Sequence, residues 1–333
     1  MRLDCFLYSQ DGFDLDVLLN QIDLMKSLKL SFLFGDQIQK SNLLIILRIE
    51  NYDKFKKEFD SSKVKSALIL DYSGQETLKV VSLFKEINIP YYGITSDRLK
   101  VQPKILFGHP FISIDRWIFD STKTFSKSPK ILHIGNYKGI QSKDNIVNIL
   151  TNKILNSSEE FLLYGSNWPN SIDRSCYKGP ISVQNVSKEY SRHNLSIGVK
   201  HPFQRGKAIS GRYWHAPLNG CQLIVEDKYL SKEIPGIIYF DFNKLNTTKF
   251  RQVIDKVNFI NSSDVKREAK KFWEKSNNIS IELIEKLFKD RRIKVGRINI
   301  LKYVRLKLGN FTYLHLKDYK RMFQYVIKKS HWK

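Results

Sequence analysis

The chain has 333 residues, 42% of them hydrophobic, a composition that excludes disordered, collagen-like and mini-protein classes and, at roughly 150 residues per domain, predicts two domains. Its longest apolar runs are far shorter than the about twenty residues that cross a membrane, and its three cysteines lack the spacing of a disulfide framework or a zinc site, so we expect a cytoplasmic protein. Its 56 Lys and Arg exceed its 33 Asp and Glu by 23 charges, which indicates a polyanionic partner such as nucleic acid, anionic lipid or a phosphorylated small molecule.

Strands and helices are predicted to alternate along the amino-terminal part of the chain. Apolar runs of buried-strand length and apolar residues at helical spacing predict strands at 3–8, 43–48, 67–70 and 90–94, and helices at 15–28 and 76–87. Strands that alternate with helices of this length are typical of βαβ units with a parallel sheet covered on both faces.

A polar stretch at 119–129 then interrupts the pattern and predicts a linker. After it the sequence predicts strands at 130–134, 160–164, 195–199, 222–225 and 237–240, and helices at 144–155, 187–191, 213–218 and 264–288, the last of these as one or two helices. The expected fold is therefore α/β, with two Rossmann-like, doubly wound domains and a basic helical tail. The expected bounds are 1–118 and 130–300 for the domains and 301–333 for the tail.

Positive charge is concentrated at the carboxyl terminus. From Lys286 to Lys333, fifteen Lys and Arg stand against two acids, with aromatic residues among them. Such a segment can lie on an anionic membrane surface or pack back on the amino-terminal domain, and a solvated lysine bias explains it equally well. No helix-turn-helix, RNA-recognition or zinc-finger pattern accompanies the charge, so nucleic acid is the less favoured partner.

A second basic zone has no acidic residue at all. Between Tyr190 and Val225 the sequence holds five Lys or Arg and three His but no Asp or Glu. This zone predicts a site for an anionic ligand, and a basic surface loop is the alternative.

Four short motifs with glycine follow predicted strands of the second half: 133–139, 164–169, 177–180 and 211–221. In doubly wound sheets, ligands bind beyond the carboxyl ends of the strands. Glycine there lets the backbone approach a phosphate or a base, and the helix that follows offers free N–H groups to an anion.

In this order and spacing the motifs resemble the carboxyl-terminal half of GT-B glycosyltransferases, and most of all the spore-maturation (CgeB-like) and group 1 (family 4-like) branches. The resemblance covers roughly 108–241, because 108–115 is similar to the stretch that ends the first domain of those enzymes. It implies two Rossmann-like domains that face each other across a cleft, with a nucleotide-sugar donor on the second domain and the acceptor on the first.

Carried over residue by residue, the resemblance implies a donor site. Gly135, Asn136 and Lys138 would lie beside the donor phosphates, and Gly165 with 177–179 would border the nucleoside. Arg212 and the helix after it would close on the ribose and the diphosphate. The full set that we expect to bind the donor is Gly135, Asn136, Lys138, Gly165, Lys178, Gly179, Arg205, Lys207, Arg212, His215, Asn219 and Gly220.

The chain departs from the family at one pair of positions. Where those enzymes have two acids eight residues apart, this sequence has Lys207 and His215. A histidine can still bind a ribose hydroxyl, but a lysine cannot replace a carboxylate. Cations at 205, 207 and 212 can stabilise a departing nucleoside diphosphate, so we expect no metal and no cofactor other than the donor itself.

An inverting reaction also needs a general base from the first domain. Asp11, in the turn after the first strand, is the best-placed carboxylate, and His109 is the second candidate. A turn-forming aspartate before glycine and a histidine satisfied within the core are the alternatives.

These observations predict a metal-independent glycosyltransferase of surface polysaccharide synthesis, with a glycan or lipid-linked acceptor. The tail from 286 onward would hold it peripherally at the inner face of the membrane. The alternatives are a nucleic-acid-binding basic protein and a non-catalytic GT-B scaffold.

Overall fold

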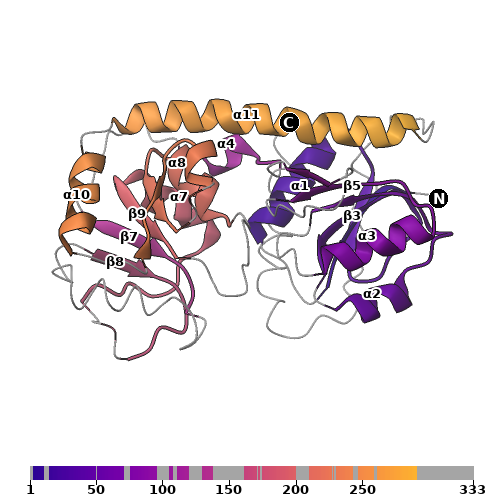
Figure 1. The fold of residues 1–333 in the computed structure, drawn as a ribbon, viewed down its shortest axis with the longest axis horizontal. Helices are drawn as coiled ribbons and strands as arrows, with labels where there is room; N and C mark the ends of the chain where they lie inside the picture. Colours follow the sequence, from indigo (N-terminus) through magenta and orange to yellow (C-terminus); the bar gives the residue numbers. More distant parts are fainter. Residues whose placement is uncertain are drawn as a thin grey trace, which may run out of the picture.

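Two parallel β-sheets, one from each half of the chain, are joined by a long helix that packs on both (Figure 1). The computed structural model describes residues 3–10, 15–49, 51–70, 76–95, 105–107, 111–119, 130–137, 161–170, 172, 175–199, 210–226, 228, 230–242, 247–258 and 261–290.

The amino-terminal sheet has six strands in the order β2-β1-β3-β4-β5-β6, and every pairing in it is parallel. Its strands are β1 (Leu3–Ser9), β2 (Phe32–Gly35), β3 (Ser41–Arg48), β4 (Val64–Ile69), β5 (Tyr91–Thr95) and β6 (Ile105–Phe107), and its helices are α1 (Leu15–Ser27), α2 (Tyr52–Glu58) and α3 (Thr77–Glu86). Most side chains of β1 and β3 are buried, which explains why these strands read as continuous apolar runs instead of alternating ones.

The second sheet has five strands in the order β11-β10-β9-β7-β8, again all parallel. Its strands are β7 (Ile131–Ile134), β8 (Phe161–Tyr164), β9 (Leu195–Gly198), β10 (Gln222–Val225) and β11 (Ile237–Tyr239), and its helices are α7 (Val183–Ser191), α8 (Arg212–Leu218), α9 (Leu230–Glu233) and α10 (Thr247–Asn258). In each sheet the second strand along the chain lies on one side of the first strand, and all later strands lie on its other side. The strand order therefore reverses between β1 and β3 and between β7 and β9, which are the topological switch points.

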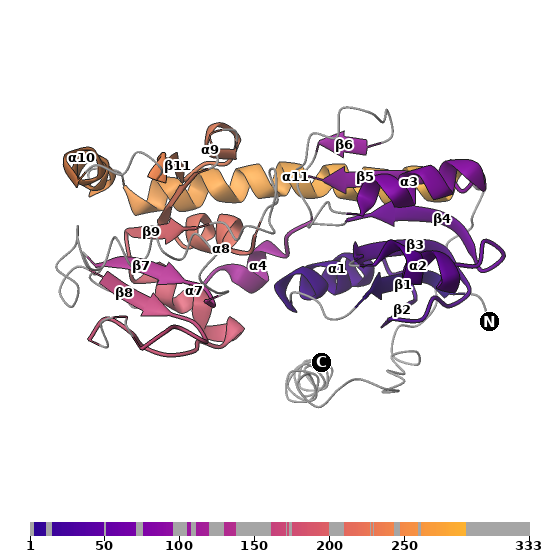
Figure 2. The ribbon, with the colours of Figure 1, turned by 60° about the horizontal axis from the view of Figure 1, so that its bottom comes forward.

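Two helices connect the halves, the short α4 (Ile114–Trp117) and the 29-residue α11 (Ser262–Asp290). Figure 2 shows α11 running the length of the molecule, from the region of α10 to that of β5 and α3. The Asn277 side chain on α11 binds both main-chain groups of Ile112, since its Oδ1 accepts from the N–H at 2.7 Å and its Nδ2 donates to the C=O at 2.8 Å. Further along, the Lys286 ammonium lies 5.3 Å from the centre of the Tyr92 ring on the amino-terminal sheet.

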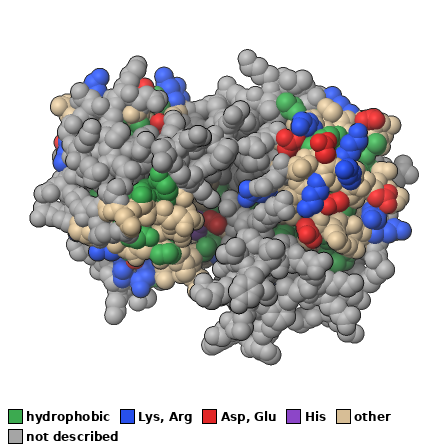
Figure 3. Space-filling model, turned by 90° about the horizontal axis from the view of Figure 1, so that it is seen from below, with side chains coloured by type: hydrophobic (Ala, Val, Ile, Leu, Met, Phe, Trp, Pro, Cys, Tyr) green, Lys and Arg blue, Asp and Glu red, His purple; other side chains and the backbone are tan. Residues whose placement is uncertain are grey.

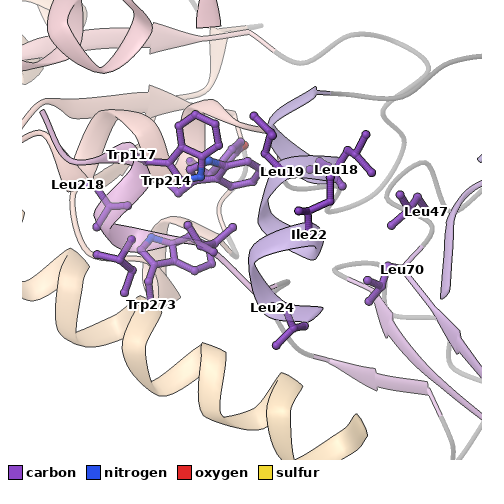
Figure 4. Close-up of a cluster of buried hydrophobic side chains, with 14 of the residues drawn as sticks. Leu18, Leu19, Ile22, Leu24, Leu47, Leu70, Trp117, Trp214, Leu218 and Trp273 are labelled. Atoms are coloured by element: carbon purple, nitrogen blue, oxygen red, sulfur yellow. The ribbon is translucent and has the colours of Figure 1, made fainter. Parts of the chain in front are cut away.

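One hydrophobic cluster extends through both halves (Figure 4). Trp117, Trp214 and Trp273 come together from α4, α8 and α11, and leucine and isoleucine side chains of α1 lie next to them. The cluster continues to Leu47, near the end of β3, and to Leu70, directly after β4. Because a single apolar core spans the contact between the sheets, separating the halves would expose these tryptophans to water.

The fold class predicted from the sequence is confirmed. The bounds of β10 agree with the prediction, and 264–288 lies within a single helix. Six elements were not predicted from the sequence: β2, β6, α2 and α4 in the first half, and α9 and α10 in the second. The predicted helix at 144–155, residues 120–129 of the linker and the tail after 290 lie outside the described residues. The domain bounds stay a prediction, and none of the described helices combines the length and the apolar character needed to cross a bilayer.

Candidate functional site

A glycine follows each of the strands β7 and β8 at the carboxyl edge of the second sheet. Gly165 follows β8 at φ +142°, and a Cβ atom on it would overlap the carbonyl oxygen of Gly135, which follows β7. Neighbouring side chains fix the two glycines: Trp168 Nε1 donates to Gly135 O at 2.8 Å, and the Tyr177 hydroxyl donates to Gly165 O at 2.8 Å. Atoms of the protein itself take up the space that a side chain would need at both positions: Gly135 O at Gly165, and the ends of the Arg212 and His133 side chains at Gly135.

The motifs that follow β7 and β8 are bonded to one another. Asn136 Oδ1 accepts from the N–H of Ser166 at 2.8 Å, and Gly165 N donates to Gly179 O at 3.0 Å. Gly179 has a φ of +78° and no atom within 4 Å of the position of its missing Cβ. The exposed Lys178 precedes it, with Nζ 3.4 Å from Ser175 O.

Arg212 lies at the switch point between β7 and β9. It is the first residue of α8, and its Nη1 donates to Val199 O at 2.8 Å, just past the end of β9. Its Nη2 lies 3.0 Å from where a Cβ on Gly135 would stand, past the end of β7. The guanidinium therefore spans the two diverging strands, at the place where doubly wound sheets bind their ligands.

His133, buried beneath this position, does not add a second charge. Its Nδ1 lies 2.8 Å from Ile197 O and donates to it, because a carbonyl oxygen can only accept. Burial, together with the positive charge of Arg212, lowers the pKa of His133 to about 3. The ring is neutral at physiological pH, and Arg212 is the cation at this point of the sheet.

His215 does not face the same edge. It is buried one turn into α8, with its ring 4.6 Å from that of Trp117. Its Nε2 lies 3.2 Å from Asp16 Oδ2 on α1, and its Nδ1 lies 3.3 Å from Ser187 Oγ on α7. Since a carboxylate only accepts, Nε2 donates to Asp16, while the Ser187 hydroxyl can donate to Nδ1 or accept from it, according to whether Nδ1 carries a proton.

Asp16, which the sequence analysis did not select, is thus the partner of His215 across the contact between the two halves. Its side chain is 23% exposed. Burial works to raise the pKa of Asp16, but the hydrogen bond and charge of His215 outweigh it, and the pKa lies below its usual range. A Cβ atom on Gly211 would overlap Asp16 Oδ2, so the glycine before Arg212 makes room for this carboxylate.

Figure 3 shows an acidic side chain and a histidine next to each other between the two lobes of the molecule, when it is viewed from below. On the amino-terminal lobe, described Lys and Arg side chains alternate with Asp and Glu in this view. The described part of that face therefore carries mixed charge and not a continuous basic patch.

The structure brings together Gly135, Asn136, Gly165, Gly179 and Arg212, with Lys178 at the same edge. Asn219 and Gly220 lie at the other end of α8. There Asn219 accepts from Phe119 N and donates to Trp117 O, and Gly220 lies against the main chain at the start of α11. Five other predicted residues lie outside the described ones: Asp11, His109, Lys138, Arg205 and Lys207.

One feature of the sequence could have indicated Asp16. It is the acid in the first turn of the helix that follows the first strand, five residues after the selected Asp11. No pattern announced that His215 would bind it, because the two residues are 199 positions apart. Within the part of the chain that the structure describes, no three His, Cys, Asp or Glu residues are grouped as metal ligands would be.

No family model matches the sequence, and neither does any curated protein. Solved structures do match. A β-glucosyltransferase described as a DNA-modifying enzyme, solved with and without uridine diphosphoglucose, has a TM-score of 0.54 and 12% identity, over 86% of this chain and 99% of that one. The phage T4 β-glucosyltransferase with UDP and Mn²⁺ has a TM-score of 0.50 and 11% identity, over 87% of this chain and 99% of that one.

A third match is TarM of S. aureus, solved with fondaparinux, α-GlcNAc-glycerol and UDP. Its TM-score is 0.50 and its identity 13%, over 76% of this chain and 55% of that one. Together with the two doubly wound sheets, these matches show that the chain has the GT-B fold. A fold does not assign an activity, so the function has to be argued from the site.

Proposed function

We propose that the chain is a glycosyltransferase that takes a sugar from a nucleotide-sugar donor bound at the carboxyl edge of the second sheet. The observation that carries the proposal is the position of Arg212. Its guanidinium spans the switch point between β7 and β9, directly beside the glycines that follow β7 and β8.

The chemistry of sugar transfer suits this arrangement. When the bond between the sugar and the diphosphate breaks, negative charge develops on the departing phosphate oxygens. A guanidinium held in place beforehand by Val199 O stabilises that charge without having to reorganise. Glycine at 135 and 165 allows the backbone to approach the phosphates or the base closely. Lys138, Arg205 and Lys207 belong to the same proposal as further cations of the donor site.

The proposed setting is a glycan or lipid-linked acceptor in surface polysaccharide synthesis, on the cytoplasmic side. The basic segment from 286 to 333 supports it, because roughly 1 kcal/mol per cation can hold such a segment at an anionic surface. The proposed reaction is independent of metal, and the motifs support the CgeB-like or group 1 branch. Transfer assays with and without Mn²⁺ test whether the reaction is independent of metal.

A second class of acceptor is nucleic acid. The net charge of +23 favours it, as does the similarity in fold to a β-glucosyltransferase described as DNA-modifying. Radiolabelled sugar transferred to duplex DNA, with an affinity that falls steeply as salt rises, would establish this acceptor. Transfer to a lipid-linked acceptor in anionic vesicles, with no label in DNA, would establish the first one.

The donor site is tested by the thermal stability of the purified chain with UDP, GDP, CMP, ADP or dTDP, without metal. A nucleotide at one hundred times its Kd adds about 2.7 kcal/mol of stability, enough to shift the midpoint by several degrees. One nucleotide that stands out would support the proposal and identify the base. If none of the five nucleotides shifts the midpoint, even with Mn²⁺ added, only the two alternatives without sugar transfer remain: a non-catalytic GT-B scaffold and a nucleic-acid-binding basic protein.

A further inference from the structure

The carboxylate of Asp16 lies where the two halves of the proposed reaction would meet. It comes from α1, on the half expected to bind the acceptor, and its Oδ2 is in contact with Gly211, next to Arg212. The next residue along the chain is Arg212, the first residue of α8, so this carboxylate lies beside the start of the helix that carries the proposed donor-binding cation.

Asp16 is also held in place and partly open to solvent. His215 Nε2 donates to Oδ2 at 3.2 Å, while the side chain is 23% exposed. His215 is itself immobilised by burial, by Ser187 at Nδ1 and by the edge of the Trp117 ring. Such a carboxylate has one oxygen oriented by the protein and keeps accessible surface, the geometric requirements for a general base; its lowered pKa keeps it ionised but makes it a weaker base than an unpaired aspartate.

Asp23 and Asn20, on the same side of α1 as Asp16, are engaged differently. Asp23 binds Arg116 through both oxygens at 2.6 Å, and it also accepts from the Ser113 hydroxyl. Asn20 accepts from Trp117 Nε1 and from the main chain of Ser113. These contacts hold α4 against α1, whereas the contact of Asp16 is directed at α8.

We propose that Asp16 is the general base of the transfer and that His215 is the residue that positions it. This inference rests on the proposed function. The acceptor hydroxyl gives its proton to the Asp16 carboxylate while its oxygen forms a bond to the anomeric carbon. The bond from that carbon to the diphosphate oxygen breaks, and its electron pair leaves with the nucleoside diphosphate beside Arg212. Direct displacement of this kind inverts the anomeric centre and so differs from a retaining, group 1-like mechanism; the chain also departs from that branch at Lys207 and His215, where the branch has two acids.

In this scheme His215, at which the sequence differs from the related enzymes, has the role of positioning the base. A histidine stands where the related enzymes have an acid, and its Nε2 binds the carboxylate of Asp16 from the other half. The pairing forms only when the two halves are in contact, so the base is oriented in the closed arrangement. Neither residue has to bind the donor.

The test measures release of the nucleotide from UDP-glucose and from GDP-, CMP- and dTDP-sugars, with water or an added acceptor; a CMP-sugar releases CMP and the others release a nucleoside diphosphate. Asp16→Asn should lower kcat by about 100-fold or more, the usual contribution of a general base, while UDP affinity and KM for the donor stay within about twofold. Asp115→Asn is the matched control, since Asp115 is an exposed carboxylate on the neighbouring α4. It should retain full activity.

A second pair of variants changes His215, the residue of the second half that binds Asp16. His215→Gln can still donate an N–H to Asp16, whereas His215→Leu cannot. We expect the Gln variant to keep most of kcat and the Leu variant to lose about tenfold, with donor KM unchanged in both. In Asp16→Ala, added formate should restore part of the rate, because a small carboxylate can take the vacated place.

The results distinguish a failure of the assignment of Asp16 from a failure of the proposed function. A wild type that turns over a donor while Asp16→Asn retains its kcat would overturn the assignment of the base and leave the proposed function standing. Should Asp16→Asn not fold, equal kcat values for wild type, His215→Gln and His215→Leu would overturn it instead. A wild type that neither binds a nucleotide nor turns over any donor would overturn the proposed function, and this inference with it.

Discussion

Gly165 and Gly135 approach each other so closely that the carbonyl oxygen of the second occupies the place where the first would carry a Cβ atom. Both residues end strands of the same sheet, and they lie beside the cation proposed to hold the donor. Replacing either glycine therefore changes the site and the packing of the sheet together.

Gly165→Ala should lower the free energy of unfolding by at least about 3 kcal/mol, because it adds both a backbone clash and a strained φ of +142°. Gly179→Ala is the control, since Gly179 also has a positive φ but has open space around it. It should cost only about 1–2 kcal/mol. Urea unfolding of both variants measures the difference, and equal losses would contradict the close contact.

Arg212→Ala should weaken UDP binding by about 30-fold or more, since a charge-assisted contact to phosphate is worth roughly 2–3 kcal/mol. Arg212→Lys should recover only part of this loss, because a lysine cannot span Val199 O and a phosphate with one planar group. Lys178→Ala, at the exposed rim of the same edge, should change the affinity about threefold at most. Calorimetric titration with UDP compares them, and a larger loss for Lys178 than for Arg212 would place the phosphates elsewhere.

Acid should destabilise the chain through His133. Its pKa of about 3 in the folded state lies below the unfolded value of about 6.5, so the unfolded chain binds the extra proton. The stabilisation is fully present above pH 6.5 and is lost progressively as the pH falls towards 3. His133→Gln should flatten this part of the stability curve by up to about 4 kcal/mol, as measured by unfolding at several pH values. An unchanged slope would mean that the folded protein accommodates a charged ring.

Asn277→Leu should lower the free energy of unfolding by about 1–3 kcal/mol, because it leaves the N–H and C=O of Ile112 without their partner on α11. Its neighbour Asn278 is exposed on the same helix and serves as the control. Asn278→Leu should stay within about 0.5 kcal/mol of the wild type. Similar values for the two variants would show that the contact with 111–113 adds little.

The sequence was informative where a single local pattern determined the structure. The continuous apolar runs of β1, β3 and β10 and the helical spacing of α1 were sufficient to predict these elements. The short β2 was missed because its four residues carry little pattern. The seven-residue α2 was missed although Asn51 stands before it as an N-cap, with Oδ1 accepting from Lys54 N at 2.9 Å.

For the candidate site, the structure shows which of the predicted residues lie together, while their role in donor binding stays a prediction. Glycines after strands and an arginine at a helix start are local features of the sequence, and Gly135, Gly165 and Arg212 do lie together. The pairing of His215 with Asp16 depends on how two separate sheets meet, which no spacing along the chain encodes. The same holds for Asn219, which was expected at the donor and is occupied in joining α8 to Trp117 and Phe119.

The length of α11 has a consequence for how the protein can be divided. At 1.5 Å per residue its 29 residues extend for about 43 Å, so one helix covers Trp214 of the second half through Trp273, near its middle, and reaches Tyr92 of the first half near its carboxyl end. A fragment that stops before α11 would lack this cover, and a fragment that begins after the first sheet would expose the far part of the helix. The two halves should therefore not yield separate soluble fragments, and co-expressed pieces should recover a folded protein only when α11 is intact in one of them.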